Sequence, residues 1–116
     1  MMAGGGRFAF YAHMQPGSLR VQVGDVVQRG EVLGLLGNSG NTDGPHLHFH
    51  VMDGPSPLGS NGLPFVFRSF ESEGTVTNDI DDIEAGQRAV IGPALAGPHQ
   101  NQLPLINQIV SFPPMR

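Results

Sequence analysis

Apolar and polar residues alternate strictly along one short stretch, residues 46–51, which reads His-Leu-His-Phe-His-Val. A period of two is typical of a strand with one buried and one exposed face. The pattern predicts that the apolar side chains face the core and that the imidazoles share the opposite face. The two sets are Leu47, Phe49 and Val51, and His46, His48 and His50. Because same-face neighbours on a strand are spaced by ~6.6 Å, we expect adjacent imidazoles not to touch, but two of them to reach one metal ion or water.

A run of turn-forming residues leads into this stretch. Residues 37–44 read Gly-Asn-Ser-Gly-Asn-Thr-Asp-Gly, and Pro45 then restricts the backbone at the start of the strand. Histidine is the commonest metal ligand and the usual acid or base at neutral pH. A loop that delivers three histidines to a strand therefore favours a functional site, although surface histidines without a function give the same pattern.

Other alternating stretches predict more short strands separated by glycine turns. Residues 7–14 form the first, with Phe8, Phe10 and Ala12 on one face, Tyr11 on the other, and His13 at its end. Further strands are expected at residues 19–23, 26–27, 32–36, 63–70, 88–91 and 103–112, with turns at 24–25 and 30–31.

The remaining segments predict loops. Residues 52–62 form a long loop, the acidic residues 71–87 form a solvated face, and residues 93–102 form a loop with an exposed, structural His99. With 17 glycines, 10 prolines and almost no helical periodicity, the chain is expected to be all-β, with a glycine-rich, mainly antiparallel sheet or sandwich. We expect a β core at residues 1–70 and a C-terminal β extension at 71–116 that packs on it.

Composition excludes several classes of function. The net charge is −4, and all six basic residues are arginines, so there is no basic stripe for nucleic acid. The absence of cysteine excludes disulfides and thiolate metal sites. No apolar run approaches the ~20 residues of a membrane span, and residues 1–6 contain no apolar signal region.

Three ordered motifs carry a family resemblance. They are Tyr-x-His at residues 11–13, Val-Gly-Asp-Val-Val-x-x-Gly-x-Val-Leu-Gly-x-x-Gly-x-x-Gly at residues 23–40, and Gly-Pro-His-Leu-His-Phe at residues 44–49. Together they resemble the second half of the M23 peptidases, the LytM- or lysostaphin-type zinc endopeptidases that cut peptide cross-links of bacterial cell walls. The resemblance implies a glycine-rich antiparallel β fold with a long groove.

The resemblance also implies roles for individual residues. His48 would be a zinc ligand, while His46 would bind or activate the attacking water. His13 would be its partner in polarising that water or stabilising the oxyanion. His50 replaces an acidic or amide residue and is expected to be exposed or to contact a ligand from outside the metal shell.

The zinc ligand set is expected to be incomplete. Family members take two further ligands from an upstream His-x-x-x-Asp motif, and no such pair occurs in this chain. A stable zinc site needs three or four protein ligands. The chain is therefore expected to be the C-terminal part of such an enzyme, inactive on its own, and to bind zinc weakly or not at all, chiefly through His48 with His46 or His13.

Three other functions are alternatives to a peptidase. A biotinyl or lipoyl carrier fails because the chain has no lysine. A sugar-phosphotransferase carrier would use His13 with His46 or His48 for phosphohistidine chemistry, and the ordered motifs argue against it. A non-catalytic module that binds cell-wall peptide or activates a hydrolase is the main alternative.

The family resemblance also implies a binding partner and a location. The partner is bacterial cell-wall peptide, and the location is periplasmic or extracellular by resemblance. An apolar face built from Phe8, Phe10, Leu47 and Phe49 would lack cover, so a homodimer is expected. The alternative is that residues 103–112 fold back over that face.

Overall fold

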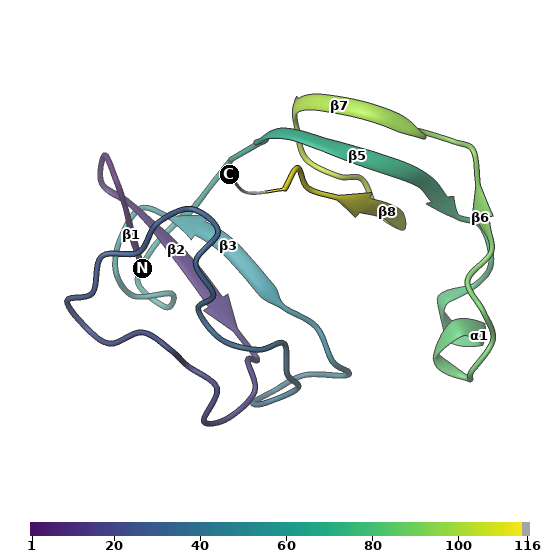
Figure 1. Cartoon of the computed structure of the whole chain (residues 1–116). Coiled ribbons are helices and arrows are strands. Elements are labelled where there is room, and N and C mark those ends of the chain that lie inside the picture. Colours follow the sequence, from purple (N-terminus) through teal and green to yellow (C-terminus); the bar gives the residue numbers. More distant parts are fainter. Residues whose placement is uncertain (115–116) are drawn as a thin grey trace. The chain divides into compact units, whose positions relative to one another are not determined.

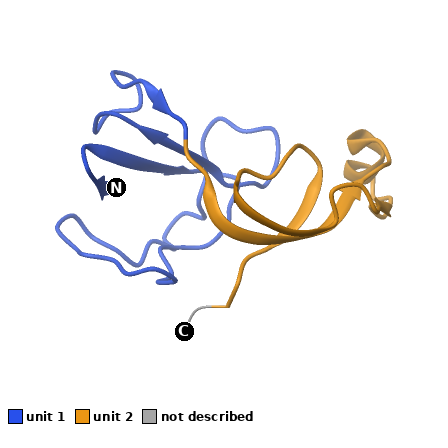
Figure 2. Cartoon of the chain, turned by 90° about the horizontal axis from the view of Figure 1, so that it is seen from above, with its two compact units in different colours: residues 1–64 blue, residues 65–116 orange. Residues whose placement is uncertain are grey.

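Short antiparallel strands form nearly all of the regular structure in the computed structural model, which describes residues 1–114 (Figure 1). The chain divides into two compact units, residues 1–64 and residues 65–116 (Figure 2). The boundary lies ahead of the domain boundary that the sequence predicts after residue 70, and the assignment of a core and an extension stays a prediction. The all-β prediction is confirmed.

Unit 1 is built on a four-stranded antiparallel sheet in the order β1-β2-β3-β4. The strands are Met2–Gly4, Arg7–Ala12, His48–Met52 and Gly62–Leu63. β2 and β3 come from the two stretches with the clearest alternation, and they lie side by side although a long segment separates them in sequence. Both strands are shorter than predicted, because His13 and His46 lie just outside them.

Residues 14–47 contain no strand, so the predicted strands at 19–23, 26–27 and 32–36 are wrong. The segment doubles back on itself, and isolated backbone hydrogen bonds join its two arms. The Gln15 N–H donates to the Leu35 carbonyl at 2.9 Å, and the Arg20 N–H to the Leu33 carbonyl at 2.9 Å. Alternation allows a strand, but a strand also needs a continuous ladder with a neighbour.

The two predicted turns of this segment are confirmed and share one design. In residues 22–25 and again in residues 28–31, a glutamine N–H donates to the acidic side chain three residues later, Asp25 or Glu31. The N–H of that acidic residue returns a bond to the glutamine carbonyl. Gly24 and Gly30 occupy the third turn positions with φ of 95° and 85°, which only glycine adopts without strain.

Unit 2 is organised around one long strand, β5 (Phe67–Val76), which pairs antiparallel with every other strand of the unit. These are β6 (Ile91–Gly92), β7 (Gly97–Gln102) and β8 (Gln108–Ser111). β8 pairs with β5 and so belongs to the sheet of unit 2; the alternative that residues 103–112 fold back over the N-terminal sheet stays a prediction. β5 starts and ends later than predicted.

The acidic segment is solvated, as predicted, but it has regular structure. Glu71 and Glu73 are exposed on β5, and a short helix, α1 (Ile80–Glu84), follows. The Asp79 side chain caps α1 by accepting from the Asp81 N–H, and acidic residues in the first turn favour the positive end of the helix dipole. None of the helices in residues 1–114 is long and apolar enough to span a membrane.

His99 differs from its prediction, because it lies in β7 and is half-buried. Its ring stacks on Phe70 with centroids 5.1 Å apart and planes at 12°. Its two nitrogens lie 2.7 Å from the Leu95 carbonyl and 2.9 Å from the Gln102 side-chain oxygen. These contacts engage both nitrogens within unit 2.

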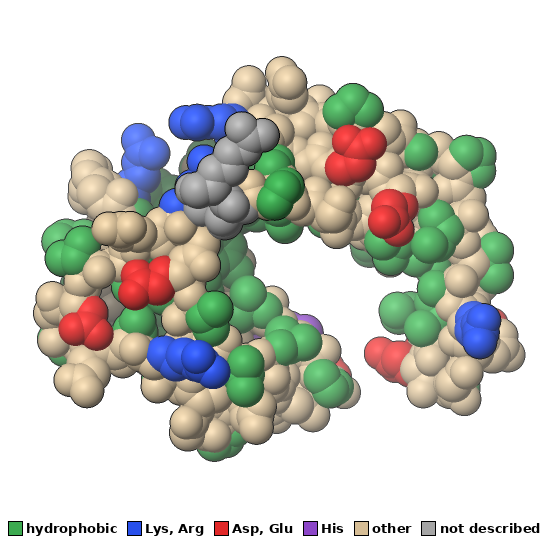
Figure 3. Space-filling view, in the orientation of Figure 1, with side chains coloured by type: hydrophobic (Ala, Val, Ile, Leu, Met, Phe, Trp, Pro, Cys, Tyr) green, Lys and Arg blue, Asp and Glu red, His purple; other side chains and the backbone are tan. Residues whose placement is uncertain are grey.

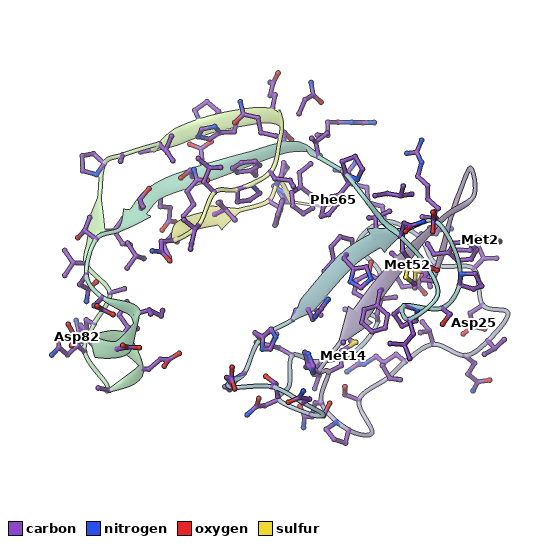
Figure 4. All side chains as sticks on the ribbon, turned by 180° about the vertical axis from the view of Figure 1, so that it is seen from behind. Met2, Met14, Asp25, Met52, Phe65 and Asp82 are labelled. Carbon is purple, nitrogen blue, oxygen red and sulfur yellow. The ribbon has the colours of Figure 1, made fainter. Side chains whose placement is uncertain are left out.

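Few side chains are buried. In unit 1 only Ala9 and Met52 are below a tenth exposed, at 7% and 3%, and in unit 2 Phe70 is the most buried hydrophobic residue, at 2%. Met52 lies at the end of β3 (Figure 4). Apolar side chains appear on the visible surface of both units (Figure 3). Each sheet therefore has a small core and a large apolar surface in contact with water.

Candidate functional site

β2 and β3 place two histidines and one phenylalanine on the same face of the unit 1 sheet. The register pairs Phe10 with His50 and Ala12 with His48, and directly opposed residues point to the same face. The Phe10 ring stacks on His50, with centroids 4.9 Å apart, and meets His48 edge-on at 5.6 Å. The expected apolar face that joined Phe8 and Phe10 to Leu47 and Phe49 is thus wrong, because Phe10 shares the face of the histidines.

His48 and His50 are in direct contact. His48 Nε2 and His50 Nδ1 are 2.9 Å apart, which is hydrogen-bond distance, so one nitrogen donates its proton to the other. The expectation that adjacent imidazoles do not touch is wrong. The ~6.6 Å step separates the backbone positions, and the side chains close that gap by leaning toward each other.

His13 joins the cluster through an unusual backbone conformation. It follows β2 with φ of 66°, the left-handed region, where histidine is rare but tolerated. Its ring lies 4.8 Å from the His46 ring and 5.8 Å from the His48 ring, measured between centroids. Its Nδ1 lies 2.7 Å from the Ser39 carbonyl, and the Ser39 hydroxyl donates to the Met14 carbonyl at 2.6 Å.

His46 is oriented by the loop that precedes it. Its Nδ1 lies 2.7 Å from the Gly44 carbonyl and 3.1 Å from the Thr42 hydroxyl, which itself donates to the Gly44 carbonyl. The His46 N–H donates to the Gly37 carbonyl at 3.2 Å. The turn-rich loop at residues 37–44 therefore fixes both the backbone and the ring of His46.

These bonds define the proton positions of two rings. A carbonyl oxygen can only accept, so Nδ1 of His13 and Nδ1 of His46 carry the proton. When either ring is neutral, its Nε2 holds the lone pair and can accept a proton or a hydrogen bond. The two rings form one pair of bases within a solvent-accessible cluster.

Gly37 allows the loop to approach the end of β2. A Cβ built at this position would overlap the backbone of Met14 and Gln15. Met14 follows β2 directly after His13 (Figure 4). Only glycine therefore lets the loop that carries Ser39 come within bonding distance of His13.

The structure has an apolar hollow of about 230 Å³, and some of its lining residues are close in sequence to the four histidines. It is lined by Tyr11, Met14, Leu33, Gly34, Leu35, Leu36 and Leu47. Tyr11 and Leu47 are near neighbours of His13, His46 and His48 along the chain. The segment at residues 33–36 thus contributes a side wall, although it forms no strand.

The four histidines predicted from the sequence, at positions 13, 46, 48 and 50, are brought together, and their individual roles stay predictions. Sequence reasoning missed Phe10, Ser39 and Thr42. Ser39 and Thr42 lie in the loop whose composition pointed to a turn, but turn propensity does not say which hydroxyl or carbonyl will face a ring. Phe10 could have been found only from the strand register.

Histidines on one face of a sheet are side chains that can act as acids or bases at neutral pH or as metal ligands. The chain belongs to Peptidase family M23, whose family model matches residues 1–60. It is also similar to Endolysin 2638A of Staphylococcus phage 2638A, with 48% identity over 44 residues. That match covers 35% of this chain and 9% of the endolysin, so the chain spans only a small part of that relative. No solved structure matches the chain.

Whether this chain can hold the zinc that the family implies depends on the donors that its described residues present. Catalytic zinc takes three protein ligands and keeps one position open. Within residues 1–114, no three His, Cys, Asp or Glu side chains gather in a way that could hold a metal ion, and the Nδ1 atoms of His13 and His46 are occupied by carbonyls. These residues do not fit a three-ligand zinc site.

Proposed function

We propose that this chain carries the histidine-bearing part of a peptidoglycan peptidase site. In this proposal it binds the peptide of bacterial cell walls and does not cleave it alone. Family membership and the similarity to a phage endolysin support cell-wall peptide as the ligand. The single observation that carries the binding role is the pair formed by His13 and His46, whose Nδ1 atoms are fixed by backbone carbonyls.

Peptide recognition follows from this arrangement. The Nε2 of a neutral imidazole accepts from a peptide N–H, and the same nitrogen in an imidazolium donates to a peptide carbonyl. Because both rings are held by the loop, little side-chain freedom is lost on binding. The apolar hollow beside Tyr11 and Leu47 would take the methyl or methylene groups of the bound peptide.

The same pair accounts for the acid–base role that the family resemblance implies. His13 and His46 lie 4.8 Å apart between centroids, so one ring can hold a proton while the other keeps its lone pair. Hydrolysis needs an activated water as well, and the described donors do not provide a three-ligand zinc site for it. We therefore propose a binding module with the acid–base half of a peptidase site, acting outside the cytoplasmic membrane, where the wall lies. Recovery of the native protein only in the cytoplasm would contradict that location.

Cosedimentation with purified peptidoglycan tests the proposal. Wild-type chain and the control variant His99→Asn are expected to pellet with peptidoglycan equally. The double variant His13→Asn/His46→Asn loses two hydrogen bonds of about 1 kcal/mol each, so its affinity should fall about thirtyfold. Equal binding by the double variant, or no binding by wild type, would overturn the proposal.

A further inference from the structure

Unit 2 has a hollow of its own, of about 350 Å³, which we call the unit 2 hollow. It is lined by residues 69–71 of β5, residues 98–100 of β7, and residues 111–114 at the end of β8 and beyond. Since β7 and β8 both pair with Glu71 and Ser72, they flank β5 on opposite edges (Figure 1). The volume lies within the range of small-molecule sites, about 300–1,000 Å³.

A stacked pair of rings makes the unit 2 hollow rigid. Phe70 and His99, both among its lining residues, are directly opposed on β5 and β7, and their rings stack with centroids 5.1 Å apart. Phe70 is only 2% exposed, and the His99 nitrogens lie within bonding distance of oxygens inside unit 2. The hollow is therefore largely formed before a ligand arrives, which lowers the entropy cost of binding.

Four polar side chains of the hollow are available to a ligand. They belong to Ser69, Glu71, Gln100 and Ser111, and within residues 1–114 they make no hydrogen bond or ion pair with the protein. Ser69 is opposite Gln100, and Glu71 is opposite Ser111, so the four share one face of the sheet. Two hydroxyls, one amide and one carboxylate therefore converge on one small area.

The charge of the hollow excludes several classes of ligand. The chain has no lysine, and no arginine of residues 1–114 lines the hollow. A phosphate would therefore find no cationic donor and would be repelled by Glu71. An acyl chain would bury the Glu71 carboxylate without a partner, which is costly. An uncharged ligand with hydroxyl groups and an apolar side meets neither penalty.

We infer that the unit 2 hollow is a binding subsite for an uncharged saccharide. Pro98, Phe112 and Pro113 also line it, and they offer flat apolar surface to the C–H face of a sugar ring. The sugar's hydroxyl and acetamido groups bond to the four polar side chains, which both donate and accept. This goes beyond the proposed function, which assigns the peptide to unit 1. It rests on that function only for the source of the saccharide, the glycan of the same wall.

An NMR titration of the whole chain with triacetylchitotriose, a soluble and peptide-free oligomer of N-acetylglucosamine, tests the inference. The backbone amide signals of Ser69, Glu71 and Gln100 should shift together and saturate at millimolar saccharide, while those of His13 and His46 stay unchanged. Glu71→Ala removes a charged acceptor, so the affinity should fall about tenfold. Glu73→Ala is the matched control, because it removes the same charge from an exposed position of β5 outside the hollow. It should bind the saccharide as wild type does.

Either of two results with the saccharide would overturn the inference: wild-type signals that do not shift, or Glu71→Ala with wild-type affinity. Pentaglycine that shifts these signals when the saccharide does not would also overturn it, since the hollow would then recognise peptide. The wild-type titration needs no variant, so poor folding of a substituted chain leaves the test intact. Because the probe contains no peptide, failure here leaves the role of His13 and His46 in peptide binding unaffected.

Discussion

The left-handed backbone at His13 decides whether its ring meets those of His46 and His48. Continued alternation from β2 would put His13 on the face of Tyr11, opposite to that of Phe10, His48 and His50. Its φ of 66° ends the alternation, and its ring contacts those of His46 and His48. A non-glycine residue in this region costs about 1–3 kcal/mol, and the bond from Nδ1 to the Ser39 carbonyl offsets part of that cost. The sequence pattern contains no signal for such a turn.

Gly37→Ala tests the close approach that this bond requires. The new methyl group would overlap the backbone of Met14 and Gln15, so the loop must move away from His13. We expect the free energy of unfolding to fall by about 1–3 kcal/mol, as in other overpacked sites. Denaturant unfolding followed by circular dichroism measures it.

Gly44→Ala is the matched control, since a Cβ at Gly44 meets no atom within 4 Å and its φ is not left-handed. It should unfold at the same denaturant concentration as wild type. If Gly37→Ala also unfolds there, the loop does not need glycine at this position, and the packing described for residues 37–40 is wrong.

At the scale of elements, the sequence predicted the strands that carry the site better than their surroundings. β2 and β3 alternate clearly and have turn residues on both sides, so local pattern and tertiary pairing agree. The alternation at residues 19–36 gave the same signal, but no neighbouring strand supplies a ladder. Local patterns record which side chains could share a face, and not whether a partner strand exists.

In unit 2 the sequence pattern failed to predict regular structure that is present. β5 runs on through residues 71–74, where exposed Glu71 and Glu73 alternate with buried Ser72 and Gly74. The buried positions of this alternation hold serine and glycine instead of large apolar residues. The sequence therefore gives the pattern of a solvated segment. α1 has only five residues, too few for helical periodicity to be visible, although Asp79 is a good capping residue.

The loop between β3 and β4 should respond to pH through Asp53. Hydrogen bonds from the Asn61 backbone N–H at 2.8 Å and then its side-chain amide at 3.1 Å lower the pKa of Asp53 from its usual 3.8. Because the folded pKa of Asp53 is depressed, the stabilisation that its bonds with Asn61 give the loop is fully present above the unfolded pKa. It is lost as pH falls through the folded pKa, below 3.8.

An NMR titration of the Asn61 amide between neutral pH and pH 2 follows this change. We expect the Asn61 backbone amide signal to move with a midpoint below 3.8. In Asp53→Asn, which keeps the shape and removes the charge, the titration should be absent. A midpoint above 3.8 in wild type would show that Asn61 does not stabilise the carboxylate.

For the whole molecule, exposed apolar surface on unit 1 predicts self-association. Six large hydrophobic side chains of one segment are more than two-fifths exposed: Leu19, Val23, Val26, Val32, Leu35 and Leu36. Large apolar side chains that are exposed together on one segment often mark an interface. We expect a homodimer or larger species in equilibrium sedimentation at micromolar concentration.

Val23→Ser/Val26→Thr should shift that equilibrium toward monomer, because these two side chains are 108% and 90% exposed and touch little of their own chain. Leu58→Ser is the control, since Leu58 is 99% exposed but lies in the loop between β3 and β4. A wild-type chain that stays monomeric at all these concentrations would rule out this interface.

The central claim is that this chain binds cell-wall peptide through its histidines and does not hydrolyse it alone. The most direct measurement is the release of new amino groups from purified peptidoglycan, after incubation with the chain and Zn²⁺, with an active M23 endopeptidase as the positive control. The account predicts cosedimentation of the chain with peptidoglycan and no release above buffer. Release of amino groups that a chelator abolishes would contradict it.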